Sequence, residues 1–476
     1  MGAPLTGSSD HGWKDGGMPD SEDVVTHVRE RRVVVIGAGV AGLVAAWECA
    51  RVGLTVTVLD AADRLGGSLA PVEIDGLTLD AAHIDIAPGD PEAEAVLHLL
   101  GCDTVSVPDA RIALAGGGPL PGDELLGIPV NPWAPEVRRI IGWSGTWRAY
   151  LDRLRPPLTI GREPRLGALV RTRLGERVAD RLVTPLAAAR WETTPDDLDA
   201  DAVLPGISTA LTRTGSLTGA VSQLQAHPEP ARRALRSGFA SLVAALDTHL
   251  RDLSVEVHTG REATGITARD EGWRVTTGDA DIHADAVIIA TGAADAGRLL
   301  EPVLGDVEAL VAVDEVDVVT LVVDATDVAQ GGPDVLVFPR GSEVYSATDV
   351  TARSPQVGPA RRVIRVVLAA SERDDAALAA VAAASVTDLV GASLTSSRVR
   401  GVARSRRVAA GTGRRVADSA RREATRAMID AHEGLDIVGG WLAGGDVADE
   451  IGDAVRTAER VRHGLLWGRE PDLGTP

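Results

Sequence analysis

Cysteine and lysine are scarce in this sequence. The 476 residues include only two cysteines, Cys49 and Cys102, which are too few for a framework of disulfide bonds. Neither the Cys-x-x-Cys nor the His-Glu-x-x-His spacing occurs, so zinc sites of those types are not expected and no metal is predicted. Lys14 is the single lysine, and it lies in residues 1–30, a stretch rich in Gly, Asp and Pro that we expect to form a flexible tail. Chemistry that depends on a lysine side chain is therefore not expected.

The sequence also lacks a net positive charge, has few phenylalanines and tyrosines, and contains no long apolar run. A formal net charge of −20 argues against a nucleic-acid partner, because neutralising phosphates requires a basic face. With two Phe and two Tyr, an aromatic pocket must rely on the nine Trp. The longest apolar run, residues 33–47, contains three glycines and is shorter than the roughly 20 residues that span a bilayer. Residues 1–30 lack the apolar stretch of a secretory signal, so we expect a cytoplasmic protein.

The first ordered segment has the pattern of a dinucleotide-binding unit. The β-branched run at 33–36 predicts a buried strand, a helix follows to about residue 52, and residues 55–59 predict a second strand. Between the first strand and the helix, Gly37, Ala38, Gly39 and Gly42 form a G-x-G-x-x-G motif. Its glycines allow a tight turn, a close approach of the backbone to a pyrophosphate and close packing of helix on strand. Asp60, at the end of the second strand, is the expected partner of a ribose hydroxyl.

The residues that follow Asp60 indicate which dinucleotide binds. Arg64, Gly66, Gly67 and Ser68 belong to an Asp-Arg-Leu-Gly-Gly-Ser stretch, in which the Arg can neutralise a pyrophosphate and the glycines let the chain pass under a large ring. The stretch resembles the D/E-x(3–5)-R-x-G-G extension of FAD-binding amine oxidases, phytoene desaturases and porphyrinogen oxidases. The resemblance implies FAD as cofactor and an α/β fold, with a Rossmann-type FAD-binding domain, an inserted α+β substrate domain and a helical subdomain.

Later segments fit the same cofactor. A strand at 285–291 and a last strand at 436–443 are expected to rejoin the FAD-binding domain, and a final helix is expected from about Gly452. Gly445, Asp446, Gly452 and Ala454 resemble the closing flavin segment of the family. Asp446 is expected either to meet the ribityl chain or to cap the segment. Val257 either contacts the adenine through its backbone or is an ordinary sheet residue.

The route of the electrons follows from a motif that is missing. No second G-x-G-x-x-G follows a predicted strand, so no NAD(P)H domain is expected. Electrons would then enter from a substrate and leave to oxygen or another diffusible acceptor. This pattern is typical of an oxidase or dehydrogenase.

The middle of the chain narrows the family. Stretches at 126–129, 166–185, 195–198, 204–205 and 238–243 resemble protoporphyrinogen and coproporphyrinogen oxidases, and the likeness runs from about residue 33 to 465. It implies the oxidation of a porphyrinogen to a porphyrin in heme biosynthesis, with oxygen as acceptor and the flavin itself as the catalytic group. Because many arginines and one lysine suit a GC-rich bacterial genome, coproporphyrinogen III is the preferred substrate and protoporphyrinogen IX the close variant.

Two stretches depart from that family pattern. Residues 188–193 stand where relatives carry a glycine pair, a tyrosine and Ala-Gly-Asp, and residues 404–411 stand where relatives carry a tryptophan and Pro-Gln-Tyr. Both departures fall on the substrate side. They keep two alternatives open: an oxidoreductase of the amine-oxidase or phytoene-desaturase type with another substrate, and a catalytically degenerate flavin-binding relative.

Candidate substrate residues lie in the same region. Arg148 and Arg190 can meet propionates, with Trp191 beside them, although a solvated helix face is the commoner role of an arginine. Trp143 and Trp147 share one helix face, where they line a substrate channel, rest on the inner surface of the cell membrane, or pack in the core. The oligomeric state is not predicted.

The expected domains alternate along the chain. They are a tail at 1–30, FAD-binding parts at 31–110 and 231–300, a helical substrate- or membrane-facing subdomain at 111–230, a substrate-domain sheet at 301–414, and a closing FAD-binding segment at 415–470.

Overall fold

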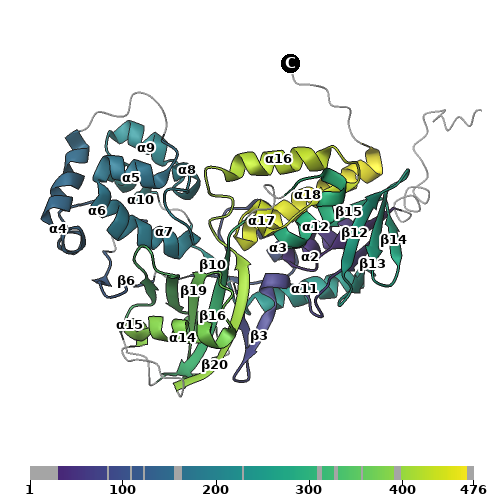
Figure 1. The fold of residues 1–476 in the computed structure, drawn as a ribbon, viewed down its shortest axis with the longest axis horizontal. Helices are drawn as coiled ribbons and strands as arrows, with labels where there is room; N and C mark the ends of the chain where they lie inside the picture. Colours follow the sequence, from purple (N-terminus) through teal and green to yellow (C-terminus); the bar gives the residue numbers. More distant parts are fainter. Residues whose placement is uncertain are drawn as a thin grey trace, which may run out of the picture.

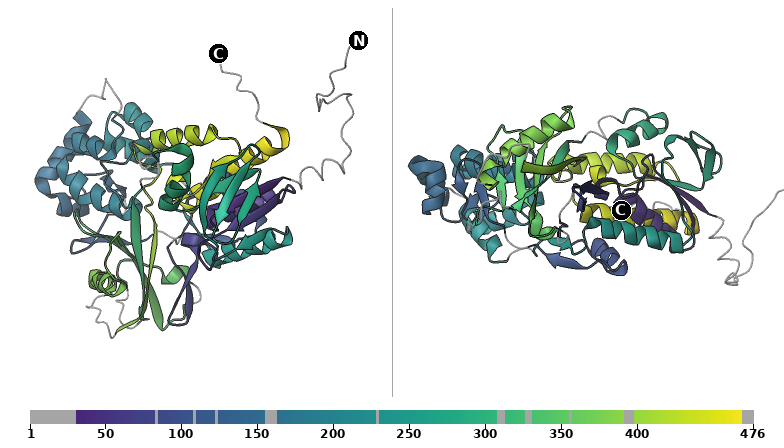
Figure 2. Two further views of the ribbon diagram at one scale, coloured as in Figure 1. Left: turned by 45° about the vertical axis from the view of Figure 1, so that its right-hand side comes forward. Right: turned by 90° about the horizontal axis from the view of Figure 1, so that it is seen from below.

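The computed structural model describes residues 31–468 apart from nine internal stretches, at 83–84, 108–109, 122–123, 155–162, 228–229, 308–312, 326–330, 355–356 and 391–397. The expected tail at 1–30, with Lys14, lies outside the described residues. Figures 1 and 2 show three parts along the long axis of the molecule. A seven-stranded sheet lies between a cluster of helices and a nucleotide-binding part built on a parallel sheet.

The parallel sheet forms the core of the nucleotide-binding part. Its strand order is β11 (Glu256–His258), β2 (Thr55–Leu59), β1 (Arg32–Ile36), β15 (Ala286–Ile289) and β21 (Leu435–Ile437), and every pair is parallel. The central strands β1 and β15 are continuous apolar runs because both of their faces are buried. Val33 and Val35 point to one core cluster, whereas Val34 and Ile36 point to another.

Helices cover one face of this sheet and a mixed layer covers the other. The first face packs against α2 (Val40–Ala50), α11 (Phe239–Asp252) and the last helix, α18 (Val447–Trp467). The second face packs against α12 (Ala293–Leu304) and a three-stranded antiparallel sheet of β12 (Ala263–Ala268), β13 (Trp273–Thr277) and β14 (Asp281–Ala284). The carboxyl ends of the parallel strands therefore remain open between the two layers, which is where α/β proteins bind ligands.

The seven-stranded sheet forms the middle of the molecule. Its order is β20 (Val399–Val408), β16 (Glu315–Asp324), β19 (Arg361–Ala369), β18 (Val344–Asp349), β17 (Val335–Val337), β6 (Ile112–Leu114) and β7 (Gly118–Pro119). All pairs are antiparallel except β17 with β6. Helices α14 (Asp375–Ser385) and α15 (Thr387–Val390) pack against it. Residues 112–119 thus lie in this sheet, although the sequence grouped them with the helical subdomain, because strands this short carry little periodic signal.

The helical cluster has its own apolar core. It contains α4 (Pro135–Tyr150), α5 (Leu166–Leu174), α6 (Glu176–Val178), a π-helical turn η3 (Ala179–Val183), α7 (Thr184–Trp191), α8 (Ala200–Val203), α9 (Ile207–Thr214) and α10 (Leu217–Gln225). Apolar residues recur at helical spacing from 166 to 186, but this segment is not one helix, because Gly175 adopts φ 94 and ends α5. The apolar period continues across the break, which is why the pattern concealed it.

Two expectations at the carboxyl end are also wrong. The strand expected over 436–443 ends with β21 at Ile437, and Gly439, at φ 139, turns the chain into the short helix α17 (Gly440–Ala443). The final helix begins at Val447 and not near Gly452, because the Asp446 side chain accepts a hydrogen bond from the Ala448 N–H and caps it.

The remaining elements connect these layers. They are η1 (Gly67–Leu69), β3 (Pro71–Ile74), β4 (Leu77–Asp80), α3 (Pro91–Leu99), β5 (Thr104–Ser106), β8 (Glu124–Leu125), β9 (Ile128–Pro129), η2 (Leu151–Leu154), β10 (Arg233–Leu235), η5 (Thr351–Arg353) and α16 (Asp418–Asp430). Across the described ranges, no helix combines the length and the apolarity needed to cross a bilayer.

Candidate functional site

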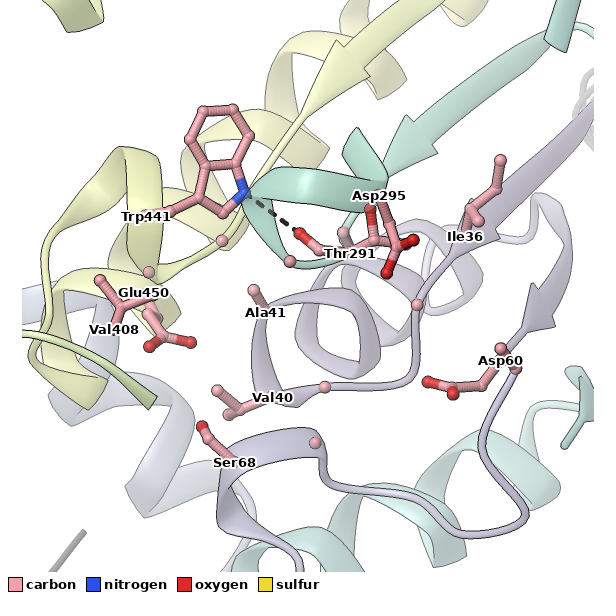
Figure 3. A pocket seen from close by; sticks show the side chains of 18 of the residues that line it. Ile36, Val40, Ala41, Asp60, Ser68, Thr291, Asp295, Val408, Trp441 and Glu450 are labelled. Atoms are coloured by element: carbon pink, nitrogen blue, oxygen red, sulfur yellow. Dashed lines mark hydrogen bonds between the residues drawn. The ribbon is translucent and has the colours of Figure 1, made fainter. Parts of the chain in front are cut away.

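A cavity of about 310 Å³ opens at the carboxyl ends of the parallel strands. Figure 3 shows that its walls come from the ends of β1 and β2, the start of α2, the turn after β15, and the α17–α18 region. The sequence motifs in these walls are the glycine-rich turn, Asp60, the Gly67-Ser68 stretch and residues 290–292.

The three motif glycines have different surroundings. A Cβ atom at Gly37 would lie 2.5 Å from the Ala290 carbonyl oxygen, and one at Gly42 would overlap the Gly37 carbonyl oxygen. A Cβ at Gly39 would meet no atom within 4 Å. Gly37 and Gly42 are therefore required by packing within the protein, whereas Gly39 leaves room beside the backbone for a ligand.

The start of α2 fits an anionic ligand. Its N-cap residue is Gly39, so no side chain caps the first turn, and Val40 and Ala41 line the cavity. Backbone N–H groups at an uncapped helix N-terminus bind phosphate well. This open cradle, with no side chain in front of it, fits the pyrophosphate of a dinucleotide.

Asp60 is held firmly at the other side of this cradle. Its Oδ2 accepts a hydrogen bond from the Ala38 N–H at 2.5 Å, and its Oδ1 accepts one from the Ala62 N–H at 2.7 Å. Both oxygens keep lone pairs that can accept a further donor, because a carboxylate has about four acceptor positions. Asp60 therefore lines the cavity in an orientation suited to a ribose hydroxyl.

The stretch after Asp60 is divided between the cavity and the surface. Gly66 donates its N–H to the Ala38 carbonyl at 2.8 Å, and this contact holds the stretch close to the glycine-rich turn. A Cβ atom built at Gly67 would lie only 3.1 Å from the Cα atom of Gly39. Gly67 and Ser68 line the cavity. Arg64 does not, because its exposed guanidinium donates to the Pro71 carbonyl at 3.4 Å.

The closing segment contributes less than its sequence suggested. Gly445 lines the cavity, but Asp446 caps α18 and forms an ion pair with Arg232 at 2.6 Å. Burial acts to raise the pKa of Asp446, but Arg232 and two backbone N–H groups outweigh it and hold the pKa below its ordinary value. Of the two interpretations of Asp446, capping is therefore the one that the geometry supports.

The cavity is not lined by three other predicted cofactor residues, Gly452, Ala454 and Val257. A Cβ at Gly452 would overlap the carboxylate of Asp90, and Ala454 is fully buried in the core. Val257 pairs with Val58 in the sheet and is not among the lining residues.

Several lining residues were missed by the sequence analysis. Gly439, Gly440 and Trp441 line the cavity, and the Trp441 indole N–H donates to the Thr291 carbonyl at 3.1 Å. Glu450 also lines it, from the first turn of α18. The Gly439-Gly440 pair after an apolar run was a signal, but the overlong strand expected over 436–443 concealed it.

Two further cavities lie between the helical cluster and the seven-stranded sheet. One, of about 660 Å³, is mostly polar, and the other, of about 1540 Å³, has walls rich in leucine and valine from α7, β6, β17 and their flanking loops. Helix α7 packs against β17 and β18 and supplies Arg190 and Trp191 to both cavities. The two cavities therefore adjoin at α7, one being mostly polar and the other mostly apolar.

Arg190 is a cation without an anionic partner in this region. Among the described residues it makes no hydrogen bond or ion pair, and its guanidinium lies 6.0 Å from the Trp191 ring. Burial, with Arg232 nearby, lowers the pKa of Arg190 to about 10, so the side chain stays charged at neutral pH. Arg190 is exposed and lines both cavities, and a cation in this position that no carboxylate neutralises is well placed to bind an anionic group of a ligand.

Arg148 is placed elsewhere. Its guanidinium donates to the carbonyls of Arg173 at 2.9 Å and Thr172 at 2.8 Å, at the carboxyl end of α5. It lines a separate small pocket with Arg171 and Glu176 and does not reach the substrate-side cavities. Arg148 thus satisfies helix-terminal carbonyls.

We call the 310 Å³ cavity at the strand ends the cofactor cavity, because its glycine-rich turn fits a dinucleotide. It meets the polar cavity at Arg407 and Gly445, which line both. Arg407 forms a bidentate ion pair with Glu192, at 2.7 and 3.1 Å, and Glu192 also accepts the Ala410 N–H at 2.6 Å. Glu192 adopts φ 51, a left-handed conformation that is costly for a residue with a side chain. The two stretches that depart from the family pattern, 188–193 and 404–411, are therefore in direct contact at this junction.

Comparison with known proteins identifies the family. A model of flavin containing amine oxidoreductases matches residues 40–323, more than half of the chain. The chain belongs to this family. A second model, of the alanine dehydrogenase/PNT C-terminal domain, matches residues 5–70, a stretch that includes the β1–α2–β2 unit.

Curated relatives of this flavin-containing amine oxidoreductase include porphyrinogen oxidases. Coproporphyrinogen III oxidase of Propionibacterium freudenreichii subsp. freudenreichii is 27% identical over 313 residues, 57% of this chain and 59% of the relative. Human protoporphyrinogen oxidase is 27% identical over 303 residues, 57% of this chain and 61% of the relative. The matched region thus spans about three fifths of these relatives.

Solved structures share the fold of this flavin-containing amine oxidoreductase over nearly its whole length. A crystal structure from Exiguobacterium sp. 255-15, provisionally named a protoporphyrinogen oxidase, has a TM-score of 0.78 at 21% identity and covers 92% of this chain and 99% of its own. The predicted α/β fold of the FAD-binding type, the resemblance to porphyrinogen oxidases and the FAD cofactor are confirmed.

The tryptophans of α4 lie on the outer surface of this flavin-containing amine oxidoreductase. Trp143 is 62% exposed and Trp147 is 55% exposed, so the core-packing interpretation is wrong for both. Neither lines a substrate-side cavity. Trp133 packs edge-on against both rings, and Arg138 lies over the Trp143 ring at 4.5 Å.

Proposed function

We propose that this protein is an FAD-dependent oxidase that converts a porphyrinogen to a porphyrin in heme biosynthesis, with oxygen as electron acceptor. The substrate that we propose is coproporphyrinogen III, with protoporphyrinogen IX as the close variant. The observation that carries the proposal is the unpartnered Arg190, at the boundary between a large apolar cavity and a polar cavity that adjoins the cofactor site.

The chemistry of the cavities supports a substrate of this class. A porphyrinogen has a broad apolar macrocycle that carries propionate groups. Apolar walls from α7, β6 and β17 suit the macrocycle, because burying its surface displaces water. A charged guanidinium suits a propionate, because a carboxylate–Arg pair gains strength away from water.

In this proposal the chain binds and orients, and no side chain acts as a base. The oxidation of a porphyrinogen to a porphyrin removes six electrons in three rounds, and in each round bound FAD would supply the two-electron acceptor that oxygen then reoxidises. The N–H groups at the start of α2 bind the pyrophosphate, and Asp60 accepts a hydrogen bond from a ribose hydroxyl. Arg190 binds a propionate, and the leucine-rich wall excludes water from the macrocycle.

Substitution of Arg190 tests this assignment. With coproporphyrinogen III, Arg190→Met should raise KM at least tenfold, because the loss of a charge-assisted contact costs about 1.5–3 kcal/mol. Flavin content should stay unchanged. The matched control is Arg148→Met, which removes an arginine from the same helical cluster but outside the cavities, and should leave KM unchanged. An unchanged KM in Arg190→Met, or an equal rise in the control, contradicts the assignment.

We also propose that the protein works in the cytoplasm with α4 against the inner face of the cell membrane. Trp143 and Trp147 are exposed on α4, and Leu154, 74% exposed, follows in η2. Arginines flank them, with Arg138 over the Trp143 ring. Tryptophan beside arginine favours the interface between lipid headgroups and acyl chains.

One observation favours a second candidate, a flavin-binding relative that does not turn over a porphyrinogen. The Glu192–Arg407 pair stands at the junction of the cofactor and substrate cavities, and both residues belong to the stretches that depart from the family pattern. If this pair separates the substrate from the cofactor, the protein binds FAD and a porphyrinogen but transfers no electrons between them.

A further inference from the structure

Glu450 is an acid that points into the cofactor cavity. It lies in the first turn of α18, and Figure 3 shows its carboxylate beside Val408, on the side of the cavity opposite Asp60. The carboxylate lies so close to Gly440 that a Cβ at that position would overlap its Oε1 atom. The absence of a side chain at residue 440 is therefore what gives Glu450 its place in the wall.

The three neighbouring acids of α18 all have arginine partners. Asp446 pairs with Arg232 at 2.6 Å, Asp449 pairs with Arg414 at 3.3 Å, and Asp453 pairs with Arg426 at 2.7 Å. In the part of the chain that the structure describes, Glu450 has neither an ion pair nor a hydrogen bond. Of the four acids that begin this helix, the one that faces the cofactor cavity is the one left unneutralised.

The cations that share the cavity are already engaged. Arg407 pairs with Glu192, and Arg406 pairs with Asp317 at 3.1 Å. On the far side, Arg298 pairs with Glu262 and Asp295. Glu315, also in the lining, is exposed to solvent. No described cation is thus left to balance a charged Glu450.

A charged Glu450 is unfavourable in this position. Burial, and then the negative charges of Asp446, Asp449 and Asp453, raise the pKa of Glu450 to about 8. A bound dinucleotide would add two phosphate charges to the same cavity, which favours the neutral acid further. A neutral carboxyl has an O–H donor that a carboxylate lacks.

We propose that Glu450 is protonated when FAD is bound and that its carboxyl donates a hydrogen bond to an acceptor atom of the flavin ring. Two observations favour the ring. Asp60, the ribose-binding acid, is on the opposite side of the cavity, and the Glu450 side is where Gly445 and Arg407 connect to the substrate region. Deprotonation would remove the donor and place a negative charge beside the cofactor. This inference rests on the family cofactor and does not require that a porphyrinogen be the substrate.

Retention of FAD across pH tests the proposal. FAD dissociation from the holoprotein is measured by equilibrium dialysis from pH 6 to pH 9.5. For the wild type, the Kd should rise about tenfold between pH 7 and pH 9, as expected for one proton with a midpoint near pH 8. Glu450→Gln keeps a neutral donor, so its Kd should be nearly independent of pH and close to the wild-type value at pH 7. Glu315→Gln removes an exposed acid from the same lining and should keep the wild-type pH dependence.

Thermal unfolding gives a second readout that does not involve FAD. An acid whose pKa is raised in the folded state stabilises the fold only below its ordinary pKa of 4.5, and that stability is lost as the pH rises towards 8. The Tm of FAD-free Glu450→Gln should therefore exceed that of the wild type at pH 9 by several degrees and match it near pH 5. Equal pH dependence of Kd in Glu450→Gln and the wild type overturns the proposal. So does a folded Glu450→Gln protein that releases FAD at every pH.

Discussion

Glycine illustrates how much a single residue position can decide in this protein. Within one motif, Gly37 and Gly42 are required by contacts inside the chain, whereas Gly39 faces open space in the cavity. The backbone of Gly39, at φ −70 and ψ 174, suits any residue, so nothing in the fold itself demands glycine there. A need for glycine at position 39 would therefore come from the ligand in the cavity. Gly42 serves the stability of the fold and Gly39 serves cofactor binding, although the two positions are only three residues apart.

Alanine substitutions at Gly39 and Gly42 should therefore affect different properties, FAD binding at the first and stability at the second. Gly39→Ala should leave the Tm unchanged and weaken FAD binding at least tenfold, because the new methyl group occupies the approach to the pyrophosphate. Gly42→Ala should destabilise the protein by about 1–3 kcal/mol, because its methyl group overlaps the Gly37 carbonyl. The measurements are thermal unfolding and FAD titration.

Gly265→Ala is the control, because a Cβ at Gly265 would meet no atom within 4 Å and its φ is not positive. The control should change neither the Tm nor FAD binding. A Gly39→Ala protein that binds FAD as tightly as the wild type contradicts the placement of the pyrophosphate at the start of α2.

At the scale of elements, the β1–α2–β2 unit was predictable to within two residues. Its signals are local: an apolar β-branched run, a glycine turn and an acid after the second strand. The segment 166–186 was not predictable as built, because its apolar period continues through Gly175 and the π-helical turn. The end of β21 at Ile437 was missed because apolar residues continue into α17, where only Gly439 marks the change.

The candidate site followed the same rule. Residues whose role depends on their own backbone, such as Gly39, Gly67 and Asp60, could be named from the motif and do line the cavity. Residues whose role depends on distant partners could not. Asp446 is engaged by Arg232, 214 positions away, and Arg148 is engaged by the end of α5.

Helix α4 carries the prediction for membrane contact. Trp143→Ser/Trp147→Ser should reduce co-sedimentation with vesicles of anionic phospholipid at least threefold, because two interfacial rings are lost. The Tm should change little, since both side chains are more than half exposed. Trp467→Ser, at the end of α18, is the control, because Trp467 is 74% exposed but lies outside the α4 cluster. Equal vesicle binding by the wild type and the double variant contradicts the proposed contact.

At the scale of the whole molecule, the substrate region exists only after three distant segments assemble. Helix α7, the β6 region and the β17 region supply the walls of the apolar cavity, and their pairing across more than a hundred residues has no local sequence signal. The chain has a net charge of −20, but arginines gather where the cavities meet. An anionic substrate would therefore be held by local cations in an acidic protein, and its binding should depend on their contacts more than on long-range attraction.

The most direct test of the account is the reaction of the FAD-loaded protein with coproporphyrinogen III. Porphyrin fluorescence is followed in air against a heat-inactivated control, and the flavin absorbance is followed without oxygen on the same substrate. The account predicts porphyrin formation well above the spontaneous rate, together with anaerobic bleaching of the flavin. A yellow protein that leaves coproporphyrinogen III unchanged, and whose flavin stays oxidised, contradicts the proposed oxidation while leaving the family and the cofactor in place.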